Sequence, residues 1–80
     1  MTVLITGAGL LGCHLAKRLA DQGSQPLLYD VSPNREYIQK IVGKDKAAVV
    51  AADLRDLPAL INALKEFKVD TLVHTAGLIG

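Results

Sequence analysis

Short apolar runs alternate along the chain with stretches whose apolar residues recur every three or four positions. The apolar runs are rich in branched residues, which is typical of strands buried on both faces of a sheet. They cover Val3–Thr6, Pro26–Asp30, Ala47–Ala51 and Asp70–His74. We therefore expect four strands, each separated from the next by a helix.

The stretches between the runs carry helical spacing. In the first, apolar side chains at Leu10, Leu11, Leu15 and Leu19 share one face, and Gly23 stands just beyond the expected helix end. In the second, Ser32 is the expected N-cap of a short helix that starts with Pro33, runs through about Val42 and is terminated by Gly43. In the third, Asp56 or a neighbour is the expected cap, and the apolar stripe consists of Leu57, Leu60, Ile61, Leu64 and Phe67.

Strands that alternate with helices predict an α/β fold with a parallel sheet and right-handed crossovers. The expected strand order is 3-2-1-4, as in a Rossmann-like sheet. A ligand crevice is expected outside the carboxyl ends of the strands, where the first and fourth strands diverge.

A glycine-rich turn, Gly7-Ala8-Gly9-Leu10-Leu11-Gly12, follows the first strand. Gly7 permits the tight turn, Gly9 has no Cβ to block a pyrophosphate, and Gly12 lets the helix lie close to the strand. The helix that opens at Leu10 and Leu11 brings unpaired N–H groups and a positive dipole end to the phosphates. The turn therefore predicts a dinucleotide-binding site.

Asp30 ends the second strand, 18 positions after Gly12, at the spacing of a ribose-binding carboxylate. The alternative is a loop carboxylate or a cap for the next helix. A carboxylate here accepts hydrogen bonds from the ribose hydroxyls and repels a 2′-phosphate, so NAD is expected rather than NADP. Arg35 could meet a 2′-phosphate, but we expect it on the helix surface. Asp53, Ala76 and Gly77 also fall at the carboxyl edge.

Composition narrows the class of protein. The 80 residues, half of them hydrophobic, carry a net charge of +1 and describe one soluble globular unit. Scattered Lys and Arg with 4% aromatics disfavour a nucleic-acid partner, and no apolar run approaches the roughly 18 residues of a membrane span. A single cysteine excludes an internal disulfide and a cysteine-rich metal site, and it fits a reducing, cytoplasmic compartment. We expect Cys13, His14 and His74 to be packing or surface residues.

Several segments together resemble the N-terminal half of the extended short-chain dehydrogenases/reductases, the family of nucleotide-sugar epimerases and dehydratases. These segments are Val3–Gly7 with the glycine turn, Asp30, Ala52-Asp53-Leu54-Arg55-Asp56 and Leu72–Gly77. The resemblance implies that Asp53 binds the adenine amino group, that Leu54 lines the adenine pocket, and that the backbone of Thr75, Ala76 and Gly77 runs beside NAD. It also implies hydride transfer on a nucleotide-sugar or another alcohol.

The chain departs from the family pattern in two respects. Its glycines are one residue closer together than the usual T-G-x-x-G-x-x-G. It also lacks the family's Tyr-x-x-x-Lys catalytic pair, since Tyr37 and Lys40 are separated by only two residues. We therefore expect residues 1–80 to be the N-terminal part of an NAD(P)-binding Rossmann domain, inactive alone, whose full-length parent is a homo-oligomer and carries the catalytic and substrate-binding part.

Two other functions remain open at this point. One is a non-catalytic dinucleotide sensor or interaction module. The other is the FAD-binding start of a flavoprotein, which fits the glycines and Asp30 but leaves the Asp53–Asp56 and His74–Gly77 segments unexplained.

Overall fold

The computed structural model describes residues 1–75, in which four strands alternate with three helices. In chain order these are β1 (Thr2–Thr6), α1 (Leu10–Asp21), β2 (Gln25–Asp30), α2 (Arg35–Val42), β3 (Ala48–Ala51), α3 (Leu57–Glu66) and β4 (Thr71–His74). The four expected strands are confirmed. Each ends at the expected residue and starts one residue away from the expected start. No helix within this part of the chain is both long and apolar enough to cross a membrane.

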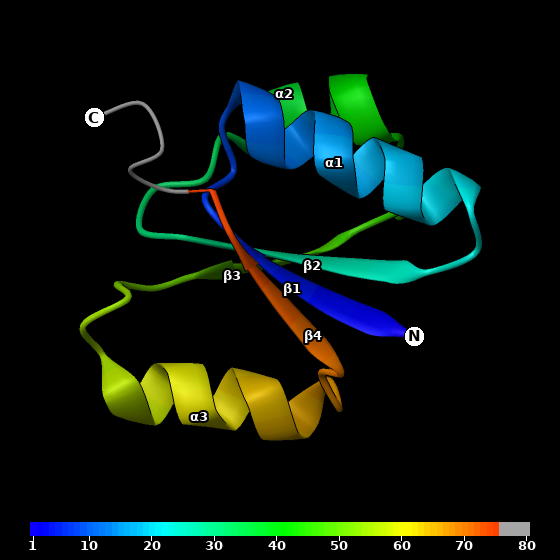
Figure 1. Ribbon diagram of the computed structural model, residues 1–80. Coiled ribbons are helices and arrows are strands. Elements are labelled where there is room, and N and C mark those ends of the chain that lie inside the picture. Colours follow the sequence, from blue (N-terminus) through cyan, green and yellow to red (C-terminus); the bar gives the residue numbers. More distant parts are fainter. Residues whose placement is uncertain (76–80) are drawn as a thin grey trace.

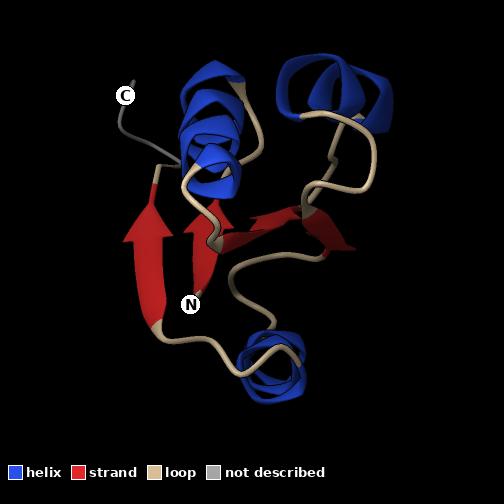
Figure 2. Cartoon of the chain, turned by 90° about the vertical axis from the view of Figure 1, so that its right-hand side faces the viewer, coloured by secondary structure: helices blue, strands red, loops and turns tan. Residues whose placement is uncertain are grey.

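All neighbouring strands are parallel, and the sheet order is β3-β2-β1-β4, as the sequence predicts. Leu4 in the middle of β1 pairs with Leu27 on one side and Leu72 on the other. Helices α1 and α2 cover one face of the sheet and α3 covers the opposite face (Figures 1 and 2). This is a Rossmann-like arrangement, and it leaves the carboxyl ends of the strands at one edge.

The sheet has an apolar layer on each face because alternate residues of β1 and β2 point to opposite sides. Val3, Ile5 and Leu28 pack beneath α1 and α2, whereas Leu4 and Leu27 pack against α3. Every one of these five side chains is buried. The first two apolar runs are therefore the central strands β1 and β2, covered on both faces, and they support the turn that follows β1.

The face by which α1 meets the sheet differs from the expected leucine stripe. Leu10 and Leu11 are 64% and 50% exposed, and the buried residues of the helix are Gly12, Cys13 and Ala16. Leu15 and Leu19 pack only at the margin of the core. The helix lies so close to β1 at its start that only small side chains fit between them.

Helix α2 starts two residues later than expected. Asn34, not Ser32, is the N-cap, and its side chain accepts a hydrogen bond of 3.0 Å from the N–H of Tyr37. The N–H of Ser32 donates to the Asp30 carboxylate at 3.1 Å. Gly43 ends the helix with φ 112°, as the sequence indicates.

Asp56 caps α3 as expected and accepts a hydrogen bond of 3.2 Å from the N–H of Ala59. The buried side of the helix is centred on Ala63, with Leu60, Leu64 and Phe67 around it. Leu57 and Ile61, which the stripe also included, are 61% and 47% exposed. Only part of the apolar stripe therefore meets the sheet.

Candidate cofactor-binding site

The turn between β1 and α1 requires glycine at two positions. Gly7 has φ 100°, a conformation that L side chains rarely adopt, and its N–H donates to the carbonyl of Tyr29 at 2.8 Å. A Cβ on Gly12 would lie 1.9 Å from the Gly7 carbonyl oxygen, so the helix approaches the strand more closely than any side chain allows. The two structural roles expected of these glycines are thereby observed.

Gly9 lies on the open side of the same turn. A Cβ there would have no heavy atom within 4 Å, and its φ of −83° is ordinary for any residue. Gly9 is the N-cap of α1 and supplies no side-chain hydrogen bond to the first helical turn. The N–H groups at the start of α1, around the exposed Leu10 and Leu11, form a donor set suited to an anion.

Asp30, at the carboxyl end of β2, reaches back to this turn. Its Oδ2 accepts a hydrogen bond of 2.7 Å from the N–H of Ala8, and its Oδ1 accepts one of 3.1 Å from the N–H of Ser32. A carboxylate has about four acceptor positions, so two remain for a ligand. Asp30 is half-buried and forms part of the wall of a small pocket.

That pocket has a volume of about 170 Å³ and lies at the carboxyl edge of β1, β2 and β3. It brings together four residues that the sequence singled out, Gly7, Asp30, Asp53 and Leu54. Tyr29, Val31 and Ala52 complete its lining and were not expected there. Their positions beside Asp30 and Asp53 in the sequence are the only signal that could have found them.

Asp53 is held by two interactions of different kinds. Its carboxylate accepts two hydrogen bonds from the Arg55 guanidinium, one of 3.1 Å from Nε and one of 2.9 Å from Nη2. These side-chain bonds, followed by the bond from the Arg55 backbone N–H, lower the pKa of Asp53 to about 2.

The carbonyl oxygen of Asp53 accepts a hydrogen bond of 3.1 Å from the hydroxyl of the buried Tyr29. Burial, followed by the charges of Asp56 and Asp53, raises the pKa of Tyr29.

Thr75, directly after β4, is bound to the end of β1. Its N–H and its Oγ1 both donate to the carbonyl of Thr6, at 2.9 and 2.7 Å, and Oγ1 also lies 3.2 Å from the carbonyl of Gly7. Thr75 thus supports the glycine turn from the side of β4. The other expected cofactor contacts on this segment, Ala76 and Gly77, lie outside the described residues.

The three residues expected to have packing or surface roles take such positions. Cys13 is buried, its Sγ donates to the carbonyl of Ala8 at 3.3 Å, and burial, followed by the charge of Asp30, raises the pKa of the thiol. His14 is exposed on α1. His74 Nδ1 lies 2.6 Å from Thr6 Oγ1 at the end of β4. In residues 1–75 no group of three potential metal-ligating side chains lies together.

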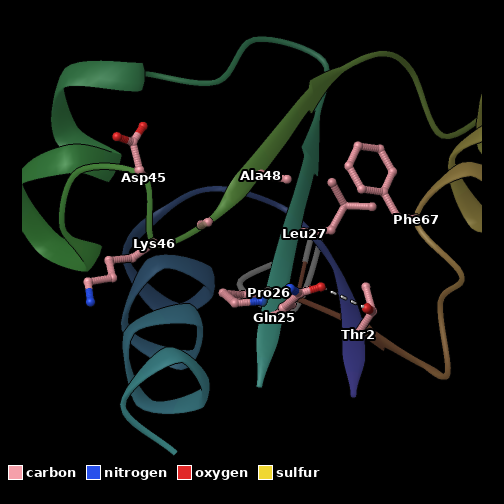
Figure 3. Close-up of a pocket in the computed structure, with 9 residues that line it drawn as sticks. Thr2, Gln25, Pro26, Leu27, Asp45, Lys46, Ala48 and Phe67 are labelled. Carbon is pink, nitrogen blue, oxygen red and sulfur yellow. Dashed lines mark hydrogen bonds between the residues drawn. The ribbon is translucent and has the colours of Figure 1, made fainter. Parts of the chain in front are cut away.

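A larger cavity of about 360 Å³ opens at the opposite edge, beside the first residues of β1, β2 and β3 (Figure 3). Phe67 packs with Leu27 at its side, while the charged ends of Asp45 and Lys46 point away from that ring (Figure 3). The charged side chains therefore do not point towards the ring, the polar side chains of Thr2 and Gln25 bind each other, and none of the expected site residues lines the cavity.

Residues 3–80 match the model of the NAD dependent epimerase/dehydratase family. Among curated proteins, UDP-glucose 4-epimerase 2 of Arabidopsis thaliana is 33% identical over 85 residues, which is 96% of this chain and 24% of that protein. The chain is therefore similar in sequence to proteins of this class over nearly its whole length.

Two solved structures superpose closely on the chain. UDP-glucose-4-epimerase from Stenotrophomonas maltophila, with bound NAD and formylated UDP-arabinopyranose, gives a TM-score of 0.83 at 33% identity, over 98% of this chain and 25% of that one. UDP-glucose 4-epimerase from Bifidobacterium longum, in complex with NAD+ and UDP, gives 0.82 at 31% identity over the same shares. This chain spans about a quarter of the length of these relatives.

Proposed function

This chain belongs to the NAD-dependent epimerase/dehydratase family, and from that membership we propose that it forms the N-terminal, NAD-binding part of a larger hydride-transfer enzyme. The substrate of that enzyme is a nucleotide-sugar or another alcohol. The observation that carries the proposal is the convergence of the glycine turn, Asp30 and Asp53 on one pocket at the carboxyl edge of the sheet.

The pyrophosphate of NAD fits the open side of the glycine turn. Gly9 offers backbone without an obstructing Cβ, and the first N–H groups of α1 point there without a side-chain cap. An anion at this position also meets the positive end of the helix dipole. Gly7, Gly9, Leu10, Leu11 and Gly12 are accordingly the proposed pyrophosphate-binding residues.

The adenosine half fits the adjoining pocket. Asp30 retains acceptor positions for the ribose hydroxyls, and its negative charge opposes a 2′-phosphate, which favours NAD over NADP. Further along the pocket, Asp53 offers an acceptor to the adenine amino group and Leu54 an apolar surface to the ring. The two solved relatives, both crystallised with NAD, support the same choice of cofactor.

The nicotinamide ring supplies the hydride acceptor when NAD is bound. Thr75, Ala76 and Gly77 are proposed to run beside the cofactor at this end of the chain. The 80 residues contain no Tyr-x-x-x-Lys pair, so we propose that they bind NAD without turning over an alcohol, and that the proton-transfer and substrate-binding groups belong to a further part of the enzyme. The formylated UDP-arabinopyranose bound by one solved relative supports a nucleotide-sugar as the substrate class.

Isothermal titration of the chain with NAD and NADP tests this proposal. We expect NAD to bind more tightly, and Gly9→Ala to weaken NAD binding by about tenfold or more, which corresponds to about 1.4 kcal/mol. Because a Cβ at Gly9 touches no protein atom, the melting temperature of this variant should fall only by the small cost of alanine at an N-cap. Equal NAD affinity of the variant and the wild type would contradict binding at the glycine turn.

A further inference from the structure

We propose that Arg55 is a positioning residue for recognition of the nucleotide base. Its guanidinium orients the carboxylate of Asp53 so that one free acceptor position is presented to the exocyclic amino group of adenine. This inference rests on the proposed function, because it assumes that the adenine end of the cofactor occupies the pocket beside Asp53. Arg55 itself is not proposed to touch the cofactor.

The hydrogen bonds that the Asp53 carboxylate accepts from Arg55 leave one of its acceptor positions free. Oδ1 accepts two bonds from Arg55, one of 2.8 Å from the backbone N–H and one of 3.1 Å from Nε. Oδ2 accepts a single bond of 2.9 Å from Nη2. Since each carboxylate oxygen has two acceptor positions, the one that remains belongs to Oδ2.

The backbone of Asp53 is fixed independently of Arg55. Its carbonyl accepts hydrogen bonds from the Tyr29 hydroxyl at 3.1 Å and from the N–H of Asp56 at 3.0 Å. Tyr29 is anchored in the apolar layer below α3. The remaining freedom of Asp53 is rotation of its side chain, which the backbone N–H of Arg55 restricts at Oδ1 and the planar fork of Arg55 restricts further by binding both oxygens.

Arg55 lies outside the pocket whose geometry it controls. Its side chain is 90% exposed, and it is absent from the pocket lining, so its loss leaves the walls of the pocket intact. An exposed ion pair contributes little to the stability of a fold because water and salt screen it. The structural result of the pair is therefore the orientation of the carboxylate.

The chemistry of the base provides a selective probe. Adenine presents an amino group that donates to a carboxylate, whereas hypoxanthine presents a carbonyl oxygen at the same position and is repelled by it. Nicotinamide hypoxanthine dinucleotide differs from NAD at this position and in carrying a hydrogen on the neighbouring ring nitrogen N1. The change in the ratio of the two affinities between wild type and Arg55→Ala therefore reports the orientation of Asp53, because contacts with N1, the pyrophosphate and the ribose are the same in both proteins.

The test is titration of the full chain with both dinucleotides. We expect the wild type to prefer NAD by about tenfold, the scale of one hydrogen bond to a charged group. Arg55→Ala should reduce the preference to less than about threefold by weakening NAD binding, with the affinity for the hypoxanthine analogue unchanged. Arg55→Lys keeps the charge but loses the fork, so it should give an intermediate ratio. Arg18→Ala, which removes an equal charge from exposed α1 surface, should leave the ratio unchanged.

The possible results distinguish a failure of the proposed function from a failure of the role proposed for Arg55. If the wild type binds neither dinucleotide, the proposed function is wrong and this inference falls with it. If the wild type binds NAD selectively and Arg55→Ala weakens both ligands equally or leaves the ratio intact, the proposed function stands and the role of Arg55 is refuted. Far-ultraviolet circular dichroism of the variant, expected to match the wild type, confirms that a changed ratio does not arise from unfolding.

Discussion

The carboxylate of Asp30 accepts a hydrogen bond of 2.7 Å from the backbone N–H of Ala8, which fastens the end of β2 to the glycine turn. The second oxygen binds the N–H of Ser32 at 3.1 Å, so one side chain joins three segments. A ribose that approaches Asp30 meets a carboxylate whose direction is already set. Folding has already restricted the rotation of this side chain, so ligand binding loses less conformational entropy.

Replacement of Asp30 should affect both stability and cofactor choice. Asp30→Ala leaves the N–H groups of Ala8 and Ser32 without this acceptor, and we expect the free energy of unfolding to fall by about 1–3 kcal/mol. The variant should also lose its preference for NAD over NADP. Urea denaturation and titration with both cofactors measure the two effects. Asp21→Ala, which removes an exposed carboxylate on α1, serves as the control and should change neither.

The same added methyl group should destabilise the fold strongly at Gly12 and only slightly at Gly9. Gly12→Ala places a Cβ against the carbonyl of Gly7 and should cost about 3 kcal/mol or more, because the helix must move away from the strand. Gly9→Ala should lower the midpoint of urea unfolding only slightly, because its Cβ meets no protein atom and its cost is that of alanine at an N-cap. Equal midpoints for the two variants would show that the close contact between α1 and β1 is absent in solution.

The sequence predicted the strands and their order more accurately than the faces of the helices. The strand runs could be recognised because residues 3–5 of β1 and 26–29 of β2 are apolar without alternation, and such strands belong inside a parallel sheet. Helical spacing alone could not show that α1 contacts the sheet through Cys13 and Ala16. That outcome depends on the separation between helix and strand, which Gly12 sets.

The candidate site shows the same division. Asp30 and Asp53 could be placed in advance because the carboxyl ends of parallel strands lie at one edge, and both residues line the pocket there. The hydroxyl of Tyr29 and the guanidinium of Arg55 could not, since each acts through a side-chain direction that spacing does not specify. The same holds for Asn34, whose side chain caps α2 in place of that of Ser32.

The ion pair between Asp53 and Arg55 predicts a specific pH dependence. The pKa of Asp53 in the folded chain is about 2, below the ordinary value of about 3.9, so the pair stabilises the fold above about pH 4. This contribution is lost as the pH falls from about 4 towards 2. The difference in unfolding free energy between wild type and Arg55→Ala should therefore shrink across that range. Thermal unfolding at a series of pH values measures it, and a difference that grows on acidification would contradict the pairing.

Cys13 should be unreactive while the chain is folded. Burial and the nearby charge of Asp30 raise the pKa of its thiol, so little thiolate is present at neutral pH, and reagent cannot reach the sulfur. Ellman's reagent should label the native chain very slowly and the urea-unfolded chain at once. Rapid labelling of the native chain would show that α1 separates readily from the sheet.

We predict that the isolated 80 residues associate in solution or unfold easily. Within residues 1–75 the strand β4 pairs only with β1, and Leu72 on β4 is about half exposed. An edge strand with an apolar face favours pairing with another chain. Sedimentation velocity should show species larger than the monomer, and Leu72→Lys should increase the monomer fraction. A sharp monomeric, two-state melting transition of the wild type would contradict this expectation.

The position of β1 inside the sheet has a kinetic consequence. Strand β1 lies between β2 and β4, both of which follow it in the chain, and the two neighbours are synthesised at very different times. Thr2 contacts Gln25, 23 positions along the chain, on one side, and Asp70, 68 positions along, on the other. The second of these contacts closes a loop that includes nearly the whole chain, which makes it entropically costly and slow. During synthesis, the edge of β1 that pairs with β4 therefore stays unpaired until α3 and β4 have been made.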